Sequence, residues 1–206
     1  MKVILYSPYL DTLGGGERYL ATIAEGLTRN GKEVFFFWDN PQIITQLSQR
    51  FHLDLAKVDT HHNIFFKKVN LLTKWSILRQ YDFAVFLSDG SIPAPLAKNN
   101  ILHFQVPFKL KNGRSFSNKI KLSFYKAVVV NSHFTKLYID ETYGVSSQVI
   151  YPPIDVNFFK PGKKENIILS VGRFSKIFAG KKQQILIEAF ASFSKRNPDY
   201  KLILAG

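Results

Sequence analysis

Cysteine is absent from this sequence of 206 residues. Without a thiol the chain cannot form a disulfide, a thiolate metal site or a cysteine nucleophile. The sequence also lacks any run that approaches the roughly 18 apolar residues of a membrane-spanning helix, and the short apolar run 3–6 is too brief for a signal peptide. We therefore expect a soluble, cytoplasmic protein.

Acidic residues are scarce, and the formal net charge is +13. Residues 90–139 contain no Asp or Glu, although they contain many cations: Lys98, Lys109, Lys111, Arg114, Lys119, Lys121, Lys126 and Lys136. A solvated basic face, an anionic membrane surface and an anionic substrate all remain open as explanations.

Short apolar runs typical of buried parallel strands alternate with amphipathic segments of helical period. Strands are expected at 3–6, 34–38, 83–87, 101–105, 127–130 and 148–151, with a further one near 64–66, and helices at 17–29, 41–51, 67–79 and 133–143. This order predicts an α/β fold, a parallel sheet with helices on both faces.

Proline and glycine then interrupt the pattern in residues 151–162, as is typical of a domain boundary. Beyond it, one strand, helix and strand are expected at 167–171, 182–196 and 202–204. Two parallel strands cannot build a stable core alone. We expect a complete domain in residues 1–158, followed by an incomplete second α/β unit, the first βαβ unit of another domain, in residues 163–206.

The glycine cluster Gly14-Gly15-Gly16 lies between the first strand and the first helix. Glycine lets backbone N–H groups approach a ligand closely, and the positive end of the helix dipole favours an anion there. A tight connection without a ligand is the alternative. A dinucleotide-binding fingerprint is excluded, because the glycines are contiguous and do not follow the strand directly, even though Asp39 is well placed to bind a ribose.

Three further groups of residues are candidates for ligand binding. Ser88 and Asp89 follow a strand, where open parallel sheets bind ligands. His103, inside a strand, is either a core histidine or a contact to a substrate hydroxyl. Arg173, Lys181 and Lys182 could converge with a helix N-terminus on one phosphate. The adjacent pair His61-His62 is a poor metal chelate.

Several motifs together resemble the family-4 retaining glycosyltransferases (glycosyl transferase group 1) of the GT-B fold. They are Ser7-Pro8, Gly14 to Arg18, Asn131-Ser132, and residues 149–155, 170–173 and 186–190. The resemblance implies a Rossmann-like acceptor domain in residues 1–158 and the start of a donor-nucleotide domain. It also implies transfer of a sugar, with retention, from a nucleotide-diphosphate sugar to a glycan or lipid-linked acceptor, without a metal or cofactor.

The resemblance also implies residue roles. Gly15 and Gly16 would line the donor diphosphate, and Arg173 and Lys181, with Lys182 as the substitute, would bind it from the donor side. The catalytic residues would be His103, Arg173 and Lys181. On the acceptor side we assign Glu17, Ser88 and Asp89.

The paired glutamates of the family's donor domain do not occur in the 206 residues. We therefore predict weak or no transferase activity for this chain alone. The rival hypothesis is a non-enzymatic basic module that binds an anionic membrane surface or nucleic acid, with nucleic acid the less favoured partner. The resemblance also implies that segments 67–79 and 109–126 are candidates for membrane contact, which would place the protein peripherally on the inner face of a membrane.

Overall fold

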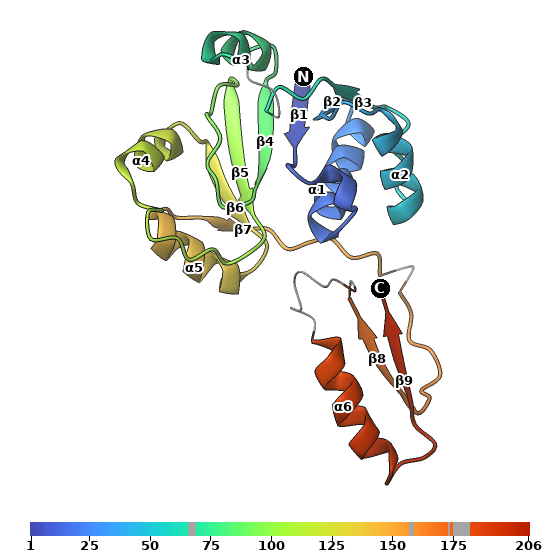
Figure 1. Cartoon of the computed structure of the whole chain (residues 1–206). Coiled ribbons are helices and arrows are strands. Elements are labelled where there is room, and N and C mark those ends of the chain that lie inside the picture. Colours follow the sequence, from blue (N-terminus) through green and yellow to red (C-terminus); the bar gives the residue numbers. More distant parts are fainter. Residues whose placement is uncertain (66–68, 157–158, 173, 175–181) are drawn as a thin grey trace. The chain divides into compact units, whose positions relative to one another are not determined.

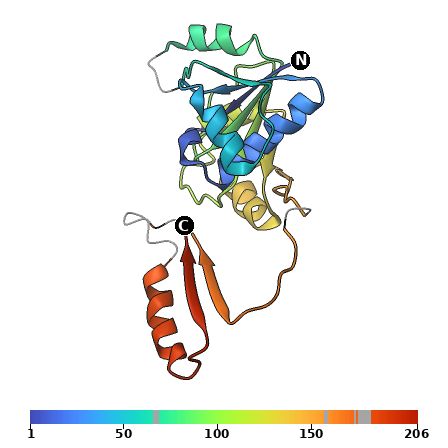
Figure 2. The ribbon, with the colours of Figure 1, turned by 90° about the vertical axis from the view of Figure 1, so that its right-hand side faces the viewer.

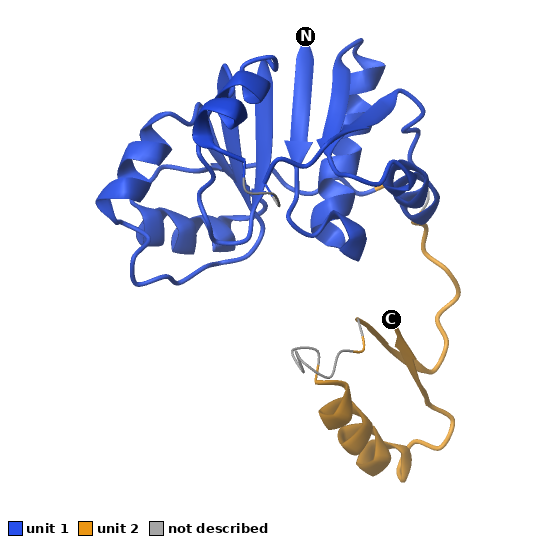
Figure 3. Cartoon of the chain, turned by 45° about the horizontal axis from the view of Figure 1, so that its top comes forward, with its two compact units in different colours: residues 1–154 blue, residues 155–206 orange. Residues whose placement is uncertain are grey.

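The computed structural model describes residues 1–65, 69–156, 159–172, 174 and 182–206. The chain divides into two compact units, residues 1–154 and residues 155–206 (Figure 3). No helix in the described part of the chain has the length and apolar character needed to cross a membrane.

Unit 1 is built on a seven-stranded sheet in the order β3-β2-β1-β4-β5-β6-β7, and every neighbouring pair is parallel. The strands are β1 (Lys2–Tyr6), β2 (Glu33–Phe37), β3 (Val58–His61), β4 (Phe83–Ser88), β5 (Asn99–Phe104), β6 (Ala127–Val130) and β7 (Gln148–Val149). This arrangement confirms the predicted Rossmann-like parallel sheet.

Helices cover both faces of this sheet, because a parallel sheet must be buried on each side. One face packs against α1 (Gly15–Arg29) and α2 (Gln42–Phe51), which lie toward the viewer in Figure 2. The other face packs against buried residues of three helices labelled in Figure 1: α3 (Leu71–Leu78), α4 (Phe116–Ser123) and α5 (His133–Tyr143). A 3-10 turn, η1 (Leu10–Thr12), precedes α1.

Polar side chains fix where three of these helices begin. The side chains of Asn70, Ser115 and Ser132 each accept a hydrogen bond from a backbone N–H in the first turn of α3, α4 and α5. Gly144 then ends α5 in the left-handed conformation, with φ of 69°. These caps satisfy backbone groups that a helix end would otherwise leave unpaired.

The structure differs from the predicted elements in the region before β4 and in the segment before β6. The third strand is β3, at Val58–His61, and residues 64 and 65 form a bend, whereas Phe66 lies outside the described residues. The helix predicted at 67–79 begins at Leu71. Helix α4, which lies within the basic segment 109–126, was not predicted.

Unit 2 contains β8 (Ile167–Val171), α6 (Gln183–Ser194) and β9 (Lys201–Ala205). The two strands pair in parallel, with Ile167 opposite Lys201 and Val171 opposite Ala205. None of its described residues is buried. The unit is thus one βαβ motif without a core of its own.

Candidate functional site

The strand order of unit 1 reverses between β1 and β4, which are neighbours in the sheet. Connections leave these two strands toward opposite faces, and ligands of open parallel sheets bind in the crevice outside the carboxyl ends of such a pair. The glycine cluster 14–16 follows β1, and Ser88-Asp89-Gly90 follows β4. The topology therefore brings two of the predicted ligand-binding loops to the same edge of the sheet.

Gly15 and Gly16, the first residues of α1, differ in their surroundings. A Cβ atom on Gly16 would lie 2.9 Å from Leu87 Cδ2 and 3.1 Å from Gln105 Oε1, whereas a Cβ atom on Gly15 would meet nothing within 4 Å. Gly16 is therefore required for the close packing of α1 on β4 and on Gln105, which directly follows β5. Gly15 is open, and its position in the first turn of α1 suits an anionic ligand.

Glu17 is only 5% exposed, and its carboxylate is held inside the glycine loop. It accepts hydrogen bonds from Ser7 Oγ at 3.0 Å, Thr12 Oγ1 at 3.1 Å and the Gly14 backbone N–H at 3.0 Å. These bonds tie the end of β1, the 3-10 turn and the start of α1 together. The structure thus gives Glu17 a role in shaping the loop, and its assignment to the acceptor side stays a prediction.

Ser88 and Asp89 make mainly local hydrogen bonds. Ser88 Oγ donates to the Ser91 carbonyl at 2.7 Å and accepts from the Gly90 N–H at 3.0 Å, while Asp89 Oδ1 accepts from the N–H and the hydroxyl of Ser91. Burial, followed by the charge of Asp89, raises the pKa of Tyr6 to about 12, which places Asp89 near the end of β1. Their role toward an acceptor stays a prediction.

His103 lies at the carboxyl end of β5 and is only 1% exposed. Its ring packs edge-on against Tyr19, with 4.3 Å between centroids, and its Nε2 atom has no hydrogen-bond partner among the described residues. Burial lowers the pKa of His103 to about 4, so the imidazole is neutral at pH 7. A neutral imidazole with a free nitrogen can exchange one hydrogen bond with a ligand.

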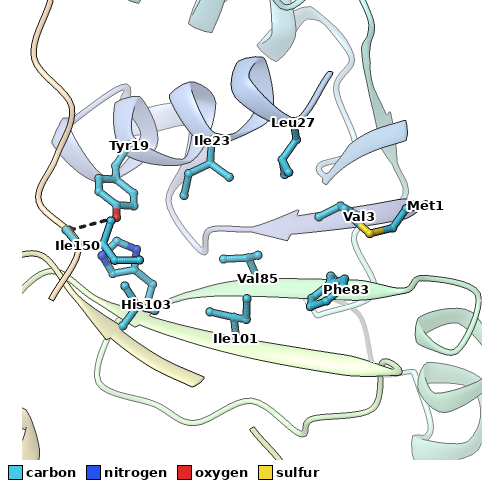
Figure 4. Close-up of a pocket in the computed structure, with 11 residues that line it drawn as sticks. Met1, Val3, Tyr19, Ile23, Leu27, Phe83, Val85, Ile101, His103 and Ile150 are labelled. Atoms are coloured by element: carbon cyan, nitrogen blue, oxygen red, sulfur yellow. Dashed lines mark hydrogen bonds between the residues drawn. The ribbon is translucent and has the colours of Figure 1, made fainter. Parts of the chain in front are cut away.

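A pocket of about 290 Å³ lies next to His103, between α1 and strands of the sheet (Figure 4). Tyr19 closes one end, where its hydroxyl donates to the Ile150 carbonyl at 3.2 Å. The lining is otherwise apolar: Met1, Val3, Ile23, Leu27, Phe83, Val85, Ile101 and Val129. Such a lining does not suit a diphosphate, which needs cations or N–H donors, and we do not assign the donor to this pocket.

Gln105 is a site residue that the sequence analysis missed. Its side-chain Oε1 lies beside Gly16, and its Nε2 is buried without a partner among the described residues. Its backbone carbonyl accepts from Asn131 Nδ2 at 2.9 Å, which fixes the segment that follows β5. The sequence does contain an indication that Gln105 belongs to the site. Gln105 follows His103 by two residues, and this spacing puts both side chains on one side of an extended chain.

Arg173 and Lys181, two of the predicted catalytic residues, lie outside the described residues. Lys182, the substitute for Lys181, is described: it is exposed and directly precedes α6 in the left-handed conformation, with φ of 48°. The backbone N–H of Gly172 donates to the Ala205 carbonyl at 2.7 Å. The structure thus describes only part of the predicted donor-side group, and its roles stay predictions.

The described residues contain no group of three or more His, Cys, Asp or Glu side chains that could hold a metal ion. His61 and His62 have separate partners. The His61 ring stacks on Phe35 and contacts the Tyr81 hydroxyl, whereas His62 Nδ1 lies 2.6 Å from Asp39 Oδ1.

The model of Glycosyltransferase Family 4 matches residues 13–158, which is more than half of the chain and includes the glycine loop, His103 and Gln105. The chain belongs to this family.

Two solved structures show the same fold at low sequence identity. A glycosyltransferase from Rickettsia africae ESF-5 aligns with a TM-score of 0.65 and 14% identity, over 100% of this chain and 68% of that one. A putative UDP-N-acetylglucosamine 2-epimerase from Listeria monocytogenes aligns with a TM-score of 0.52 and 13% identity, over 98% of this chain and 61% of that one. No match is found among proteins of curated function.

Proposed function

We propose that the protein is a retaining glycosyltransferase that moves a sugar from a nucleotide-diphosphate sugar to a glycan or lipid-linked acceptor. The observation that carries the proposal is the open first turn of α1 at the reversal point of a sheet that matches this family. Backbone N–H groups and the helix dipole favour an anion at that place. The diphosphate of the donor has the charge that this place would bind.

The residues would contribute differently to the reaction. The first turn of α1, at Gly15 and Gly16, would stabilise the negative charge that develops on the leaving diphosphate, and Arg173 with Lys181 or Lys182 would supply cations from unit 2. His103 would exchange a hydrogen bond with a hydroxyl of the transferred sugar as a neutral imidazole. Glu17, Ser88 and Asp89 would border the acceptor. We expect the charge of the diphosphate to be compensated by these groups, without a metal ion.

Alanine variants of Gly15 and Gly16 test two different roles, ligand binding at Gly15 and close packing at Gly16. In Gly15→Ala the new methyl group enters open space, so we expect an unchanged or higher melting temperature but a Michaelis constant for the donor that rises about tenfold, because the methyl group would obstruct the diphosphate. In Gly16→Ala it meets Leu87 and Gln105, so the melting temperature itself should fall. An unchanged Michaelis constant in Gly15→Ala would contradict a diphosphate at this helix.

Activity and stereochemistry require a separate assay. We expect the protein expressed from its complete gene to transfer sugar from at least one member of a panel of UDP- and GDP-sugars. Nuclear magnetic resonance of the fresh product should show that the transferred sugar keeps the anomeric configuration it has in the donor. An inverted product would contradict retention.

A further inference from the structure

Two buried nitrogen atoms at the carboxyl end of β5 have no hydrogen-bond partner among the described residues. They are Nε2 of His103, in the last turn of the strand ladder, and Nε2 of Gln105, which directly follows β5. A buried polar atom without a partner destabilises the folded chain, so such atoms are rare in proteins. Two of them, two residues apart, indicate a place that a polar ligand completes.

Both side chains contact the same turn of α1. The His103 ring packs against the Tyr19 ring at 4.3 Å between centroids, and a Cβ atom on Gly16 would lie 3.1 Å from Gln105 Oε1. Gly16 and Tyr19 are three residues apart and so share one side of α1. Figure 4 shows His103 and Tyr19 next to each other at one end of the apolar pocket. The two unpaired nitrogens therefore belong to one place beneath the start of this helix.

The main chain at Gln105 is fixed by the segment that follows β6. Asn131 Nδ2 donates to the Gln105 carbonyl at 2.9 Å, and Asn131 Oδ1 accepts from the buried hydroxyl of Thr135 at 2.8 Å. The first turn of α5 thus holds Asn131, and Asn131 holds Gln105. A side chain supported in this way can discriminate between ligands, because its position is set before the ligand binds.

We propose that Gln105 and His103 bind the same hydroxyl group of the transferred sugar, which makes Gln105 a specificity-determining residue for the donor. A hydroxyl group both donates and accepts, so it can accept from Gln105 Nε2 while it donates to the neutral imidazole of His103. An ionised phosphate oxygen only accepts and cannot form the second bond. The inference rests on the proposed function and adds to it a requirement for one particular hydroxyl of the sugar.

Deoxy derivatives of the donor test this pairing. The probes are the nucleotide sugar that the unaltered protein uses and a set of its derivatives, each of which lacks one hydroxyl of the transferred sugar. With the protein expressed from its complete gene, one derivative should lose at least about a hundredfold in kcat/KM, because both buried nitrogens are then left unpaired. The other derivatives should lose less.

Gln105→Met keeps the length of the side chain but removes its N–H donor. It should lower kcat/KM for the complete donor about tenfold, yet change kcat/KM for that one derivative by less than about twofold, because the derivative has already lost the bond. The loss caused by His103→Ala should likewise shrink at least about tenfold for the same derivative. The melting temperature of Gln105→Met without ligand should be unchanged or higher, since a buried unpaired amide is removed.

The matched control is Gln46, which is exposed on α2. Gln46→Met makes the same substitution elsewhere and should leave kcat/KM within about twofold. Equal losses for the complete donor and every derivative in Gln105→Met would overturn the inference alone, and so would dependence of the Gln105 and His103 variants on two different hydroxyls. Absence of transfer by the unaltered protein would overturn the proposed function and this inference with it.

Discussion

The motifs β1-α1-β2 and β8-α6-β9 have the same order and the same parallel pairing, yet they differ in burial. Helix α1 buries Leu20, Ala21 and Ala24 completely, whereas α6 buries no residue. The residues of α6 are nevertheless as apolar as a core helix requires, with Ile185, Leu186 and Ile187 in succession. The local pattern of apolar residues is therefore enough to form a βαβ motif, but the motif buries its apolar residues only where other helices and strands pack against it.

The neighbours of β1-α1-β2 explain this difference. In unit 1 the sheet continues through β4 to β7, and α3, α4 and α5 bury its second face. Unit 2 has a two-stranded sheet and one helix, none of its described residues is buried, and a sheet of two strands is marginally stable by itself. The stability of the chain should accordingly reside in unit 1.

The largest loss of stability is expected from truncating a buried side chain of α1, and the same kind of truncation in α6 should have little effect. Leu20→Ala should lower the free energy of unfolding of unit 1 by about 3 kcal/mol, because the truncation leaves a cavity beside the sheet. Ile187→Ala in α6, where the side chain is 50% exposed, should change it by less than about 0.5 kcal/mol. Urea unfolding measures both values. Similar losses in the two variants would show that α6 has a packing partner comparable to that of α1.

A second effect of similar size depends on pH. All five histidines lie in residues 1–154. The folded state keeps His103 neutral down to a pKa of about 4, whereas the unfolded chain binds its proton near pH 6.5, so the contribution to stability is complete above pH 6.5 and is lost as the pH falls toward 4. The loss should reach about 3 kcal/mol at pH 4.

Urea unfolding in steps between pH 7 and pH 4 tests this contribution, with His103→Gln as the comparison. The variant should have a lower stability at pH 7 but a flatter dependence on pH, because its side chain does not titrate. Parallel curves for the two proteins would show that His103 is not buried as a neutral group. The same substitution at the exposed residue His133 provides the control for the change from histidine to glutamine, and it should leave the stability at pH 7 within about 0.5 kcal/mol.

A smaller effect is expected from the carboxylate inside the glycine loop. Glu17→Ala removes the acceptor of three hydrogen bonds, so the buried hydroxyl of Ser7 loses the carboxylate to which it donates. The free energy of unfolding of unit 1 should therefore fall by about 2 kcal/mol. The counterpart in unit 2 is Glu188, whose only described bond is an exposed contact with Gln184 Nε2 at 3.4 Å. Glu188→Ala should cost less than about 0.5 kcal/mol by the same unfolding measurement.

Hydrogen exchange should show the smallest and most local difference. Amide protons of β1 and β4, at the centre of the seven-stranded sheet, should exchange only through global unfolding, while those of β8 and β9 should exchange through local opening. Mass spectrometry of peptides resolves the two regions. Equal protection would contradict the view that unit 2 lacks a core.

The sheet could be predicted because buried parallel strands form short apolar runs that stand out from polar loops. Val3 to Tyr6 and Phe83 to Leu87 are such runs, and both lie at the centre of the sheet. The edge strand β3 (Val58–His61) was missed since Asp59, Thr60 and His61 are polar, and only Val58 is buried. Helix α4 was also missed, although Phe116 and Ile120 have helical spacing, because a helix of 8 residues repeats the apolar period too few times to stand out.

The candidate site was predictable in its location but less so in its details. Glycines after one strand and a polar loop after another indicate the ligand edge of an open sheet, and both flank the β1–β4 pair. The separate surroundings of Gly15 and Gly16 could not be inferred, because they depend on Leu87 and Gln105, which are distant in sequence. The internal role of Glu17 also depends on a contact with Ser7, on a different element.

Sugar transfer by histidine variants tests most directly whether the carboxyl edge of this sheet is an active site. In the protein expressed from its complete gene, His103→Ala should lower kcat/KM for the nucleotide sugar about a hundredfold. The reason is that the variant loses a hydrogen bond that is stronger in the transition state than in the ground state. His133→Ala, on the exposed start of α5, should remain within about twofold. Unchanged transfer by a folded His103→Ala variant, or no transfer by the unaltered protein from any nucleotide sugar, would contradict the proposed function.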